Sequence, residues 1–180
     1  MDIDMPTTDP QDEIFPVVNE RGEVIGKTTR REAHCDPMLI HPVIGIFVFN
    51  PRGEMLIQKR SATKDTDPHH WTISVGGHMR YGDTPVEAAM REAREEIGLD
   101  AKPERLRLLG ETLIRGSRES EYWYGYRYDM ETLPDLTPHP EEVAEIKFVS
   151  LSELGALIGN PAVAWSEDPK ALILKYILRK

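Results

Sequence analysis

The stretch that most constrains the fold is residues 71–99, because it combines a strand pattern with a helix whose two ends are both marked. Residues 71–75 are strand-like, and we expect Gly76-Gly77 to end that strand. Residues 84–87, TPVE, form a capping-box pattern with proline at the first helical position, and Gly98 is a typical helix stop. A strand, a short connection and a helix that begins at the proline are therefore predicted here.

The predicted helix carries an unusual group of carboxylates. At about 100° per residue, Glu92, Glu95 and Glu96 fall within an arc of roughly 100°, which we place opposite the apolar stripe. Like charges at these spacings destabilise an isolated helix unless a cation neutralises them, and oxygen-only ligands select Mg²⁺ or Mn²⁺. The alternative is a solvated face softened by Arg91 and Arg94. The apolar stripe consists of Val86, Ala89, Met90, Ala93 and Ile97.

Strand and helix patterns alternate along the rest of the chain, which predicts an α/β (α+β) fold with a central mixed β-sheet. Residues 43–49 are apolar on both alternating faces, so this strand is expected at the centre of the sheet. The polar, acidic residues 1–13 are expected to form a flexible tail, which leaves residues 14–180 as one domain. Further elements are a hairpin around residues 19–22, strands at 55–59, 106–114, 122–130 and 145–149, and helices opening at Ser150 and after Trp165.

The composition limits the classes of molecule that this protein is expected to bind. The net charge of −9 and the pI near 5.2 argue against binding to nucleic acid polymers or membrane surfaces, because both need a basic protein face. A phosphorylated substrate would require local cations. The single cysteine, Cys35, and the lack of a long apolar run or an export leader predict a cytoplasmic protein. Oligomeric state stays open, with a homodimer as one option.

The acidic helix belongs to a longer pattern. Gly77 is followed after five residues by Asp83, and after seven more by REAREEIGL, residues 91–99. This resembles the Nudix box, here residues 77–99, except that Asp83 stands where the pattern has glutamate. The resemblance implies an α/β/α sandwich and hydrolysis of a diphosphate linked to another moiety. It also implies a site in which Mg²⁺ (or Mn²⁺) is held by Glu92, Glu95 and Glu96, with Arg91 braced by Asp83.

A narrower resemblance, to the type I isopentenyl-diphosphate isomerases of the same superfamily, runs from about Ile14 to the C-terminus. The segments that carry it include VVNERGEVIG, HCDPMLIH, QKRSATKDTDPHHWTISVGGH, ESE and PEEVAEIKFVSLSEL. It implies a second divalent metal, Zn²⁺ or Mn²⁺, which a mixed imidazole and carboxylate set suits. It also implies that Arg60 and Lys64 contact the diphosphate. The implied ligands of the second metal are His34, His41, His78, Glu119 and Glu121.

One departure separates the two activities. The isomerases place an essential acid/base cysteine at the position of Gly76, opposite the glutamate that matches Glu121, and glycine cannot transfer a proton. They also usually lack the complete Arg-Glu-x-x-Glu-Glu run. We therefore expect a Nudix hydrolase, a pyrophosphohydrolase that cleaves a small molecule of the nucleoside diphosphate-X type through metal-activated water. The alternatives are an isomerase with altered acid/base groups and a Nudix-fold binding domain without turnover.

Aromatic residues near the predicted site have two interpretations. Rings can stack on a base or enclose an apolar group, but a place in the core is the default for each. We assign substrate contact to Trp71 and Trp165, the latter because PAVAWSEDPKAL is similar to the isomerases' C-terminal segment near the substrate. Tyr122, Trp123 and Tyr124 are further candidates.

Overall fold

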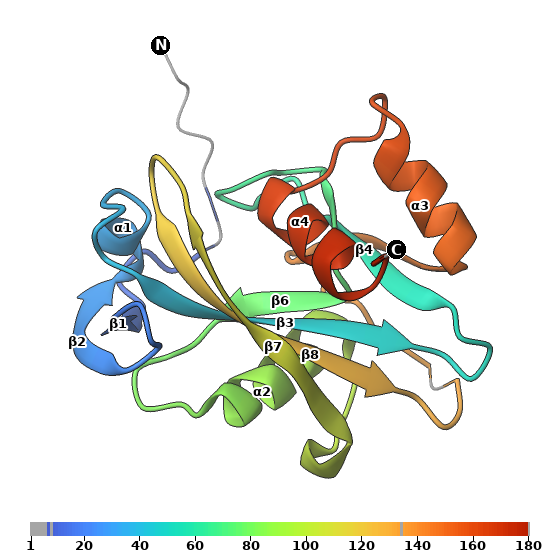
Figure 1. The fold of residues 1–180 in the computed structure, drawn as a ribbon, viewed down its shortest axis with the longest axis horizontal. Coiled ribbons are helices and arrows are strands. Elements are labelled where there is room, and N and C mark those ends of the chain that lie inside the picture. The colour runs from blue at the N-terminus through green and yellow to red at the C-terminus, as the bar shows by residue number, and fades with distance from the viewer. Residues whose placement is uncertain (1–6, 8, 134, 180) are drawn as a thin grey trace.

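The computed structural model describes residues 7, 9–133 and 135–179. Figure 1 shows three layers, with a twisted sheet between helix α2 (Pro85–Ile97) on one face and helices α3 (Leu151–Gly159) and α4 (Glu167–Tyr176) on the other. This arrangement confirms the predicted α/β/α sandwich with a mixed sheet. Among the described residues, no helix is long and apolar enough to span a membrane.

The larger sheet is built around strand β3 (His41–Phe49). Strand β8 (Ser120–Asp129) runs parallel to β3, whereas β6 (Val75–His78) pairs with it in antiparallel register. The remaining strands of this sheet are β4 (Met55–Arg60), β5 (Trp71–Thr72), β7 (Leu106–Arg115) and β9 (Val143–Val149).

Strand β3 is central because both of its faces are covered. Ile44 and Ile46 pack in the core on the α2 side, and Val43 and Phe47 pack in the core under α3 and α4. All nine residues of the strand are buried. A fully buried aliphatic or aromatic side chain contributes about 1.5–3 kcal/mol to the stability of the fold. Because β3 supplies such side chains to both cores, it joins them. The prediction from residues 43–49 is confirmed.

A smaller sheet lies beside the main one. Strands β1 (Ile14–Val18) and β2 (Val24–Thr29) form the predicted hairpin and lead into the short helix α1 (Arg30–Ala33). The Val18 N–H donates to Ile40 O at 2.8 Å, which ties the hairpin to the start of β3. A 3₁₀ turn, η1 (Pro103–Arg105), precedes β7.

Helix α2 begins and ends where its sequence predicts. The Thr84 hydroxyl accepts from the Glu87 N–H, and the Glu87 carboxylate accepts from the Thr84 N–H at 2.9 Å. Gly98 ends the helix with a φ of 68°, a left-handed conformation in which glycine is unstrained.

The glycine pair does not end a strand, so that prediction is wrong. Gly76 and Gly77 lie within β6, opposite Gly45 and Ile44 of β3. A side chain at Gly77 would overlap the carboxyl group of Glu92 on α2. Glycine is needed at residue 77 because the helix approaches the strand closely there, not because the chain turns.

The placement of Glu96 opposite the apolar stripe is also wrong. Its side chain turns toward the sheet, and the residue is only 6% exposed. Gln58 Nε2 of β4 donates to Glu96 Oε2 at 2.9 Å, and the Gly76 N–H of β6 donates to the same oxygen at 3.3 Å. The carboxylate occupies the gap between β4 and β6. Strands β3 and β4 pair only at Phe49 and Met55, which leaves room for β6 beside β3.

The expected tail lies only partly within the described residues, since residues 1–6 and 8 are outside them. Asp9 does not behave as part of a loose segment, because it is 5% exposed and its carboxylate contacts Lys64. A buried charge needs partners of this kind, and these partners hold this part of the segment against the domain.

Candidate active site

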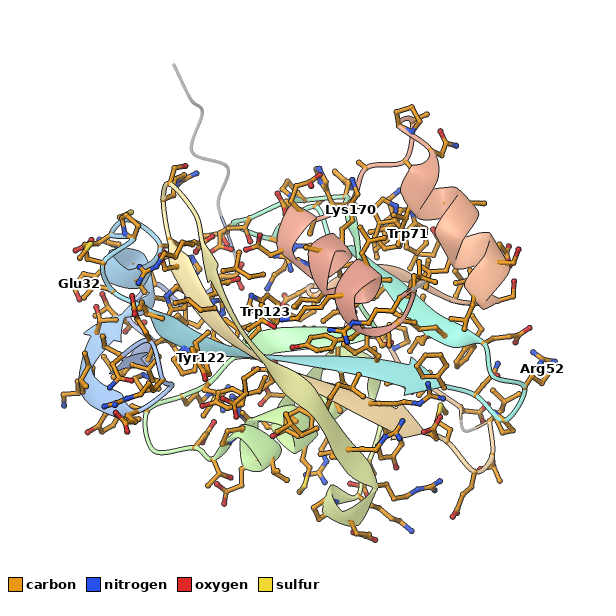
Figure 2. All side chains as sticks on the ribbon, viewed as in Figure 1. Glu32, Arg52, Trp71, Tyr122, Trp123 and Lys170 are labelled. Atoms are coloured by element: carbon orange, nitrogen blue, oxygen red, sulfur yellow. The ribbon has the colours of Figure 1, made fainter. Side chains whose placement is uncertain are left out.

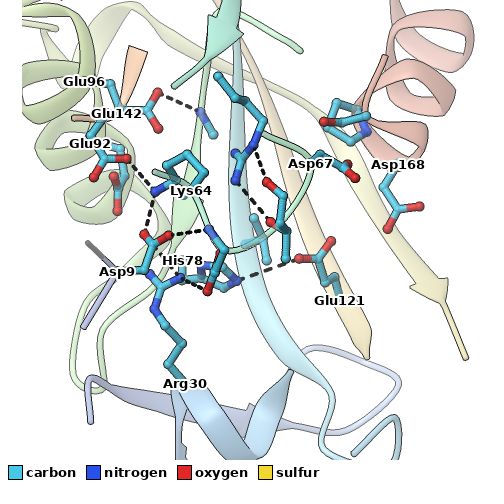
Figure 3. A pocket seen from close by; sticks show the side chains of 18 of the residues that line it. Asp9, Arg30, Lys64, Asp67, His78, Glu92, Glu96, Glu121, Glu142 and Asp168 are labelled. Carbon is cyan, nitrogen blue, oxygen red and sulfur yellow. Dashed lines mark hydrogen bonds and ion pairs between the residues drawn. The ribbon is translucent and has the colours of Figure 1, made fainter. Parts of the chain in front are cut away.

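A cavity of about 490 Å³ opens between the sheet, α2, the start of α4 and the N-terminal segment. Figure 3 shows Glu92 and Glu96 at one side, Glu121 and Asp168 at the other, and Lys64 between them. Most of the lining side chains carry charge, so the cavity suits a charged ligand that brings cations with it.

One side of the cavity is formed by Glu92, Glu95 and Glu96, which we call the glutamate cluster. Arg91 Nη1 donates to Glu92 Oε1 at 2.5 Å and to Glu95 Oε2 at 3.2 Å. The Glu95 side chain is 47% exposed, whereas that of Glu92 is 13% exposed. The arginine therefore partly neutralises two of the three carboxylates, and Glu96 is left without a cationic partner among the ion pairs of the described residues.

Arg91 is held from its other side. Its Nη2 donates to Asp83 Oδ2 at 3.1 Å and to the His78 carbonyl oxygen at 3.0 Å. The aspartate reaches the guanidinium although its side chain is one methylene shorter than glutamate. Asp83 and His78 thus fix the arginine between β6 and α2.

Burial changes the acidity of the glutamate cluster. Desolvation raises the pKa of Glu92 to about 7, although the adjacent Arg91 opposes the change. Desolvation and the nearby Glu92 carboxylate raise the pKa of Glu96 to about 8, against the hydrogen bond from Gln58. Both carboxylates are costly to ionise in the metal-free protein, and a cation bound beside them would favour their charged forms.

A second group, which we call the histidine cluster, consists of His34, His41, His78, Glu119 and Glu121, and the last three of these line the cavity. His41 lies opposite Glu121 in the parallel pairing of β3 and β8. His78 of β6 lies opposite Val43, two residues along β3 from His41, so these side chains share one face of the sheet. The structure therefore brings together all five residues that the isomerase resemblance implied.

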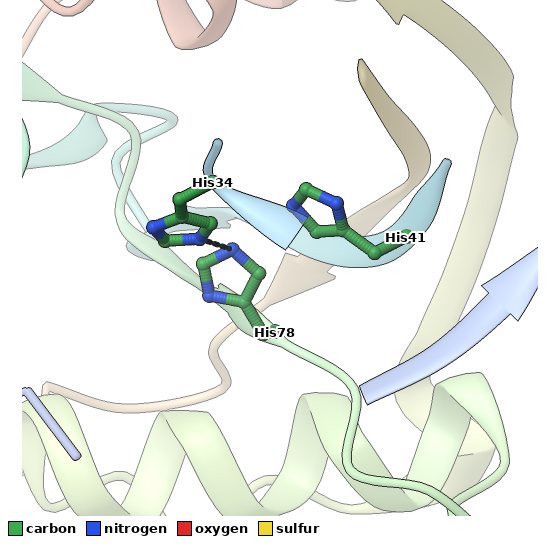
Figure 4. Close-up of side chains that lie close together, drawn as sticks. All are labelled: His34, His41 and His78. Atoms are coloured by element: carbon green, nitrogen blue, oxygen red, sulfur yellow. Dashed lines mark hydrogen bonds between the residues drawn. The ribbon is translucent and has the colours of Figure 1, made fainter. Parts of the chain in front are cut away.

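Possible ligand atoms converge within the histidine cluster. The ring nitrogens of His34, His41 and His78 lie within 4.8 Å of one another, as do ligand atoms of His41, Glu119 and Glu121. His34 Nε2 and His78 Nε2 are 3.1 Å apart. Figure 4 marks this contact with a dashed line. In the part of the chain that the structure describes, the three residues of the glutamate cluster do not form such a group.

Two atoms of the histidine cluster test whether a metal fits. His41 Nε2 and Glu119 Oε2 are buried and have no hydrogen-bond partner among the described residues. Unpaired buried polar atoms are costly, and a divalent cation would satisfy both. His41 Nδ1 lies 3.1 Å from the Leu39 carbonyl oxygen, a contact that orients the ring and favours Nε2 as the ligand atom.

Protonation states also suit a metal at the histidine cluster. Burial lowers the pKa of His41 to about 4 and holds the pKa of His78 well below its usual value. The two rings are therefore neutral at pH 7, the form that binds metals. Burial, with the nearby Glu119 and Asp168 carboxylates, raises the pKa of Glu121 well above its usual value.

Trp123 and Asp168 were not predicted as partners of the histidine cluster. Trp123 Nε1 donates to Glu121 Oε2 at 2.8 Å and so orients that carboxylate. Asp168, near the start of α4, lines the cavity beside Glu121, and burial raises the pKa of the Asp168 carboxyl. The spacing of two residues between Glu121 and Trp123 on one strand is a sequence signal that could have indicated this contact. No sequence signal pointed to Asp168.

Basic side chains cross the middle of the cavity. Arg60 lines it and donates through Nε to Thr66 O at 2.9 Å. Lys64 Nζ donates to Asp9 Oδ1 at 2.5 Å and to Glu142 Oε2 at 2.6 Å. Burial opposes the charge on Lys64, but the Glu142 and Asp9 carboxylates outweigh it and raise the lysine pKa.

Trp71 and Trp165, which we expected to contact the substrate, do not line this cavity. Both pack in the core under α3 and α4, and a backbone bridge joins the two residues. Lys147 Nζ lies 4.4 Å from the centre of the Trp71 ring. Trp123 is the tryptophan that lines the cavity. Figure 2 shows Trp71 and Trp123 on the side of the sheet that α3 and α4 cover.

Gly76 also lines the cavity, and its backbone would accept a side chain. An added Cβ would lie 3.5 Å from Ile73 Cδ1 and 3.7 Å from Ile44 O, which are ordinary contacts. Position 76 thus differs from position 77, where no side chain fits. The glycine at residue 76 is not required by packing.

Comparison with protein families gives a match of residues 39–172 to the NUDIX domain. A Nudix hydrolase of Listeria monocytogenes, described only as uncharacterized, is 37% identical over 150 residues, which cover 81% of this chain and 84% of that protein. The isopentenyl-diphosphate Delta-isomerase 2 of Photorhabdus laumondii is 35% identical over 153 residues, covering 83% of this chain and 84% of the isomerase.

A solved structure of a Deinococcus radiodurans protein has a similar fold. It superposes with a TM-score of 0.75 at 26% identity and covers 92% of this chain and 99% of its own. The sequence relatives are thus divided between hydrolases and isomerases, and the shared features do not separate the two reactions.

Proposed function

This chain belongs to the Nudix family, and from that premise we propose that it is a Mg²⁺-dependent hydrolase that cleaves a diphosphate linkage in a small molecule. The observation that carries the proposal is the glutamate cluster, which opens into the same cavity as Arg60 and Lys64. Carboxylates that bind a hard cation and basic groups that bind phosphate are both required for this reaction.

The proposed roles follow from the contacts. Glu92, Glu95 and Glu96 hold Mg²⁺ or Mn²⁺, and Glu95 or Glu96 accepts a proton from the attacking water. When bound, the ion neutralises phosphate charge and lowers the pKa of that water. Arg91 positions the first two carboxylates through its hydrogen bonds. Arg60 and Lys64 bind the phosphate oxygens and offset the net negative charge of the chain.

The side of the cavity opposite the glutamate cluster favours a polar group on the substrate. Asp67 and Asp168 lie on that side (Figure 3), and Glu167 and Arg118 also line the cavity. An isoprenyl chain placed there would bury apolar carbon against carboxylates, whereas hydroxyl or amine groups would donate to them. This charge distribution supports a nucleoside diphosphate-X type of substrate.

Isomerisation of isopentenyl diphosphate is the second candidate, and the assembled histidine cluster favours it. The reaction needs one group that adds a proton and another that removes one. Glu121 is available for the first step. Gly76 lies where the second group would be expected and offers no proton acceptor.

Purified protein with Mg²⁺ should be tested against nucleoside diphosphates, nucleoside triphosphates, nucleotide sugars and isopentenyl diphosphate. We expect phosphate-containing products from at least one nucleotide and no double-bond migration. Formation of dimethylallyl diphosphate without phosphate release would refute hydrolysis as the function.

A Gly76→Cys variant examines the missing group directly, because a Cβ atom added there meets only ordinary van der Waals contacts. We expect the variant to fold and to keep its hydrolase activity. Isomerase activity in the wild-type protein, which has glycine at residue 76, would contradict the argument that isomerisation needs a proton-transferring side chain at this position.

A further inference from the structure

The buried carboxylate of Asp9 contacts Lys64, one of the two cations that the proposed function assigns to substrate phosphate. Lys64 Nζ donates to Asp9 Oδ1 at 2.5 Å, and the Asp65 N–H donates to Asp9 Oδ2 at 3.0 Å. Arg30 Nη1 is 3.7 Å from Asp9 Oδ1. We call these three donors the anion cradle. The Asp9 side chain is only 2% exposed, so it fills this position rather than bordering it.

The cradle has more donor capacity than Asp9 uses. Arg30 is 8% exposed, and its Nε has no hydrogen-bond partner among the described residues. A buried guanidinium donor without a partner is costly, and a ligand with more acceptor oxygens than a carboxylate would satisfy it. A phosphate group has three terminal oxygens and binds arginine and lysine through the same charge-assisted bonds.

Asp9 is also the carboxylate that can leave the cradle. Glu142, the second carboxylate on Lys64, is fixed by its own N–H, which donates to His139 O at 3.0 Å near β9. Asp9 instead lies on the N-terminal segment, residues 9–12, where the Gln11 carbonyl oxygen accepts from the Arg31 N–H at 3.2 Å. This segment pairs with no strand, whereas β9 pairs with β4 from Val143 to Val149, so release of the segment costs less than displacement of β9.

We propose that Asp9 is a built-in competitor for substrate phosphate: its carboxylate occupies the anion cradle, and a phosphate group of the substrate displaces it together with the N-terminal segment. The proposal rests on the assignment of Lys64 to phosphate binding in the proposed function. It adds that affinity for phosphate is limited by an intramolecular anion. In the free protein, Asp9 shares these two buried cations with Glu142 on Lys64 and with Glu13 and Asp65 on Arg30.

Inorganic pyrophosphate is the probe, with binding to metal-free protein measured by calorimetry. We expect Asp9→Asn to bind pyrophosphate about tenfold more tightly, a difference of about 1.4 kcal/mol, because the asparagine keeps the shape and loses the competing charge. Asp12→Asn is the matched control: it removes the same charge from an exposed position on the same segment and should leave the affinity unchanged.

A second measurement uses the wild-type protein and does not depend on the stability of the variant. We expect pyrophosphate to accelerate hydrogen exchange at the Arg31 amide, because its acceptor, Gln11 O, leaves with the segment. Unchanged or weaker binding in Asp9→Asn, binding in neither protein, or slower exchange at Arg31 would each overturn the proposal. None of these readouts requires turnover, so failure of the hydrolase assay leaves them interpretable.

Discussion

The glutamate cluster and the histidine cluster share one cavity but differ in how completely they are assembled. In the histidine cluster, possible ligand atoms converge to within 4.8 Å, and buried atoms of His41 and Glu119 have no hydrogen-bond partner among the described residues. In the glutamate cluster, Arg91 binds two of the carboxylates. The first resembles a prepared metal site, and the second a site whose metal competes with an internal cation.

This difference has a physical basis. Imidazoles projecting from paired strands lose little freedom when a metal binds, because the sheet already fixes them. Glutamates on a helix have longer side chains, and an ion that keeps waters and takes phosphate ligands does not need them to converge beforehand. We therefore expect tight binding of a softer metal at the histidine cluster and substrate-dependent binding of Mg²⁺ at the glutamate cluster.

The largest effect is expected at Glu96. Glu96→Gln should lower kcat for the hydrolysed substrate by on the order of 1,000-fold, because it removes a charged group beside the reacting phosphate. Steady-state kinetics with saturating Mg²⁺ would measure this loss. Glu87→Gln changes the same residue type on the same helix at the capping position, outside the cavity, and should keep nearly full kcat. Equal losses in the two variants would show that only the helix was disturbed.

The second-largest effect is expected in metal binding by the histidine cluster. His34→Ala should weaken binding of Zn²⁺ or Mn²⁺ to the histidine cluster by on the order of 100-fold, since it removes one of the converging ligands. Metal analysis of the purified variant would check this. His70→Ala alters an imidazole outside the cavity and serves as the control. Full metal content in His34→Ala would mean that the cluster binds no metal.

A smaller effect is expected in the pH dependence of stability in EDTA. The pKa of Glu96 is raised by burial, to about 8, so the folded protein holds this proton while the unfolded chain has already released it. The free energy of unfolding should therefore fall as pH rises from about 5 to 8, by at least about 1 kcal/mol. Denaturant unfolding across this range would measure the slope. The Glu96→Gln substitution should flatten the slope of the unfolding free energy with pH. An unchanged slope would contradict the attribution of this pH dependence to Glu96.

The smallest effect concerns the departure from the Nudix pattern. Asp83 already reaches Arg91 at 3.1 Å, so Asp83→Glu should change kcat/KM by less than about threefold, within the range of a surface contact. Asp83→Ala is the comparison, because it removes the contact altogether. A large gain in Asp83→Glu would show that the shorter side chain limits catalysis.

Much of the fold was predictable because local signals agreed with tertiary contacts. The cap at Thr84, the stop at Gly98 and the doubly apolar strand at residues 43–49 each act over a few residues. Gly77 was misread because its role depends on Glu92, which is distant in sequence and adjacent in space. A glycine required by close packing looks the same in sequence as one required by a turn.

The candidate site was predictable only in part for the same reason. The histidine cluster was found through resemblance, since the spacing of His34 and His78 reveals nothing about their contact. Glu96 is buried because its side chain occupies the gap between β4 and β6. A helical wheel gives no information about such a gap. Asp9 was assigned to a loose tail because its cationic partners, Lys64 and Arg30, are far away in sequence.

The register of β3 against its two neighbours has a consequence for how such a site can change over evolution. His41 faces Glu121 across one strand boundary, and His78 lies beside Val43 across the other. An inserted or deleted residue within any of these strands would send its ligand to the opposite face of the sheet. Loops around the cavity can vary in length and alter which molecules are accepted, but the strand positions of His41, His78 and Glu121 must stay in register with one another.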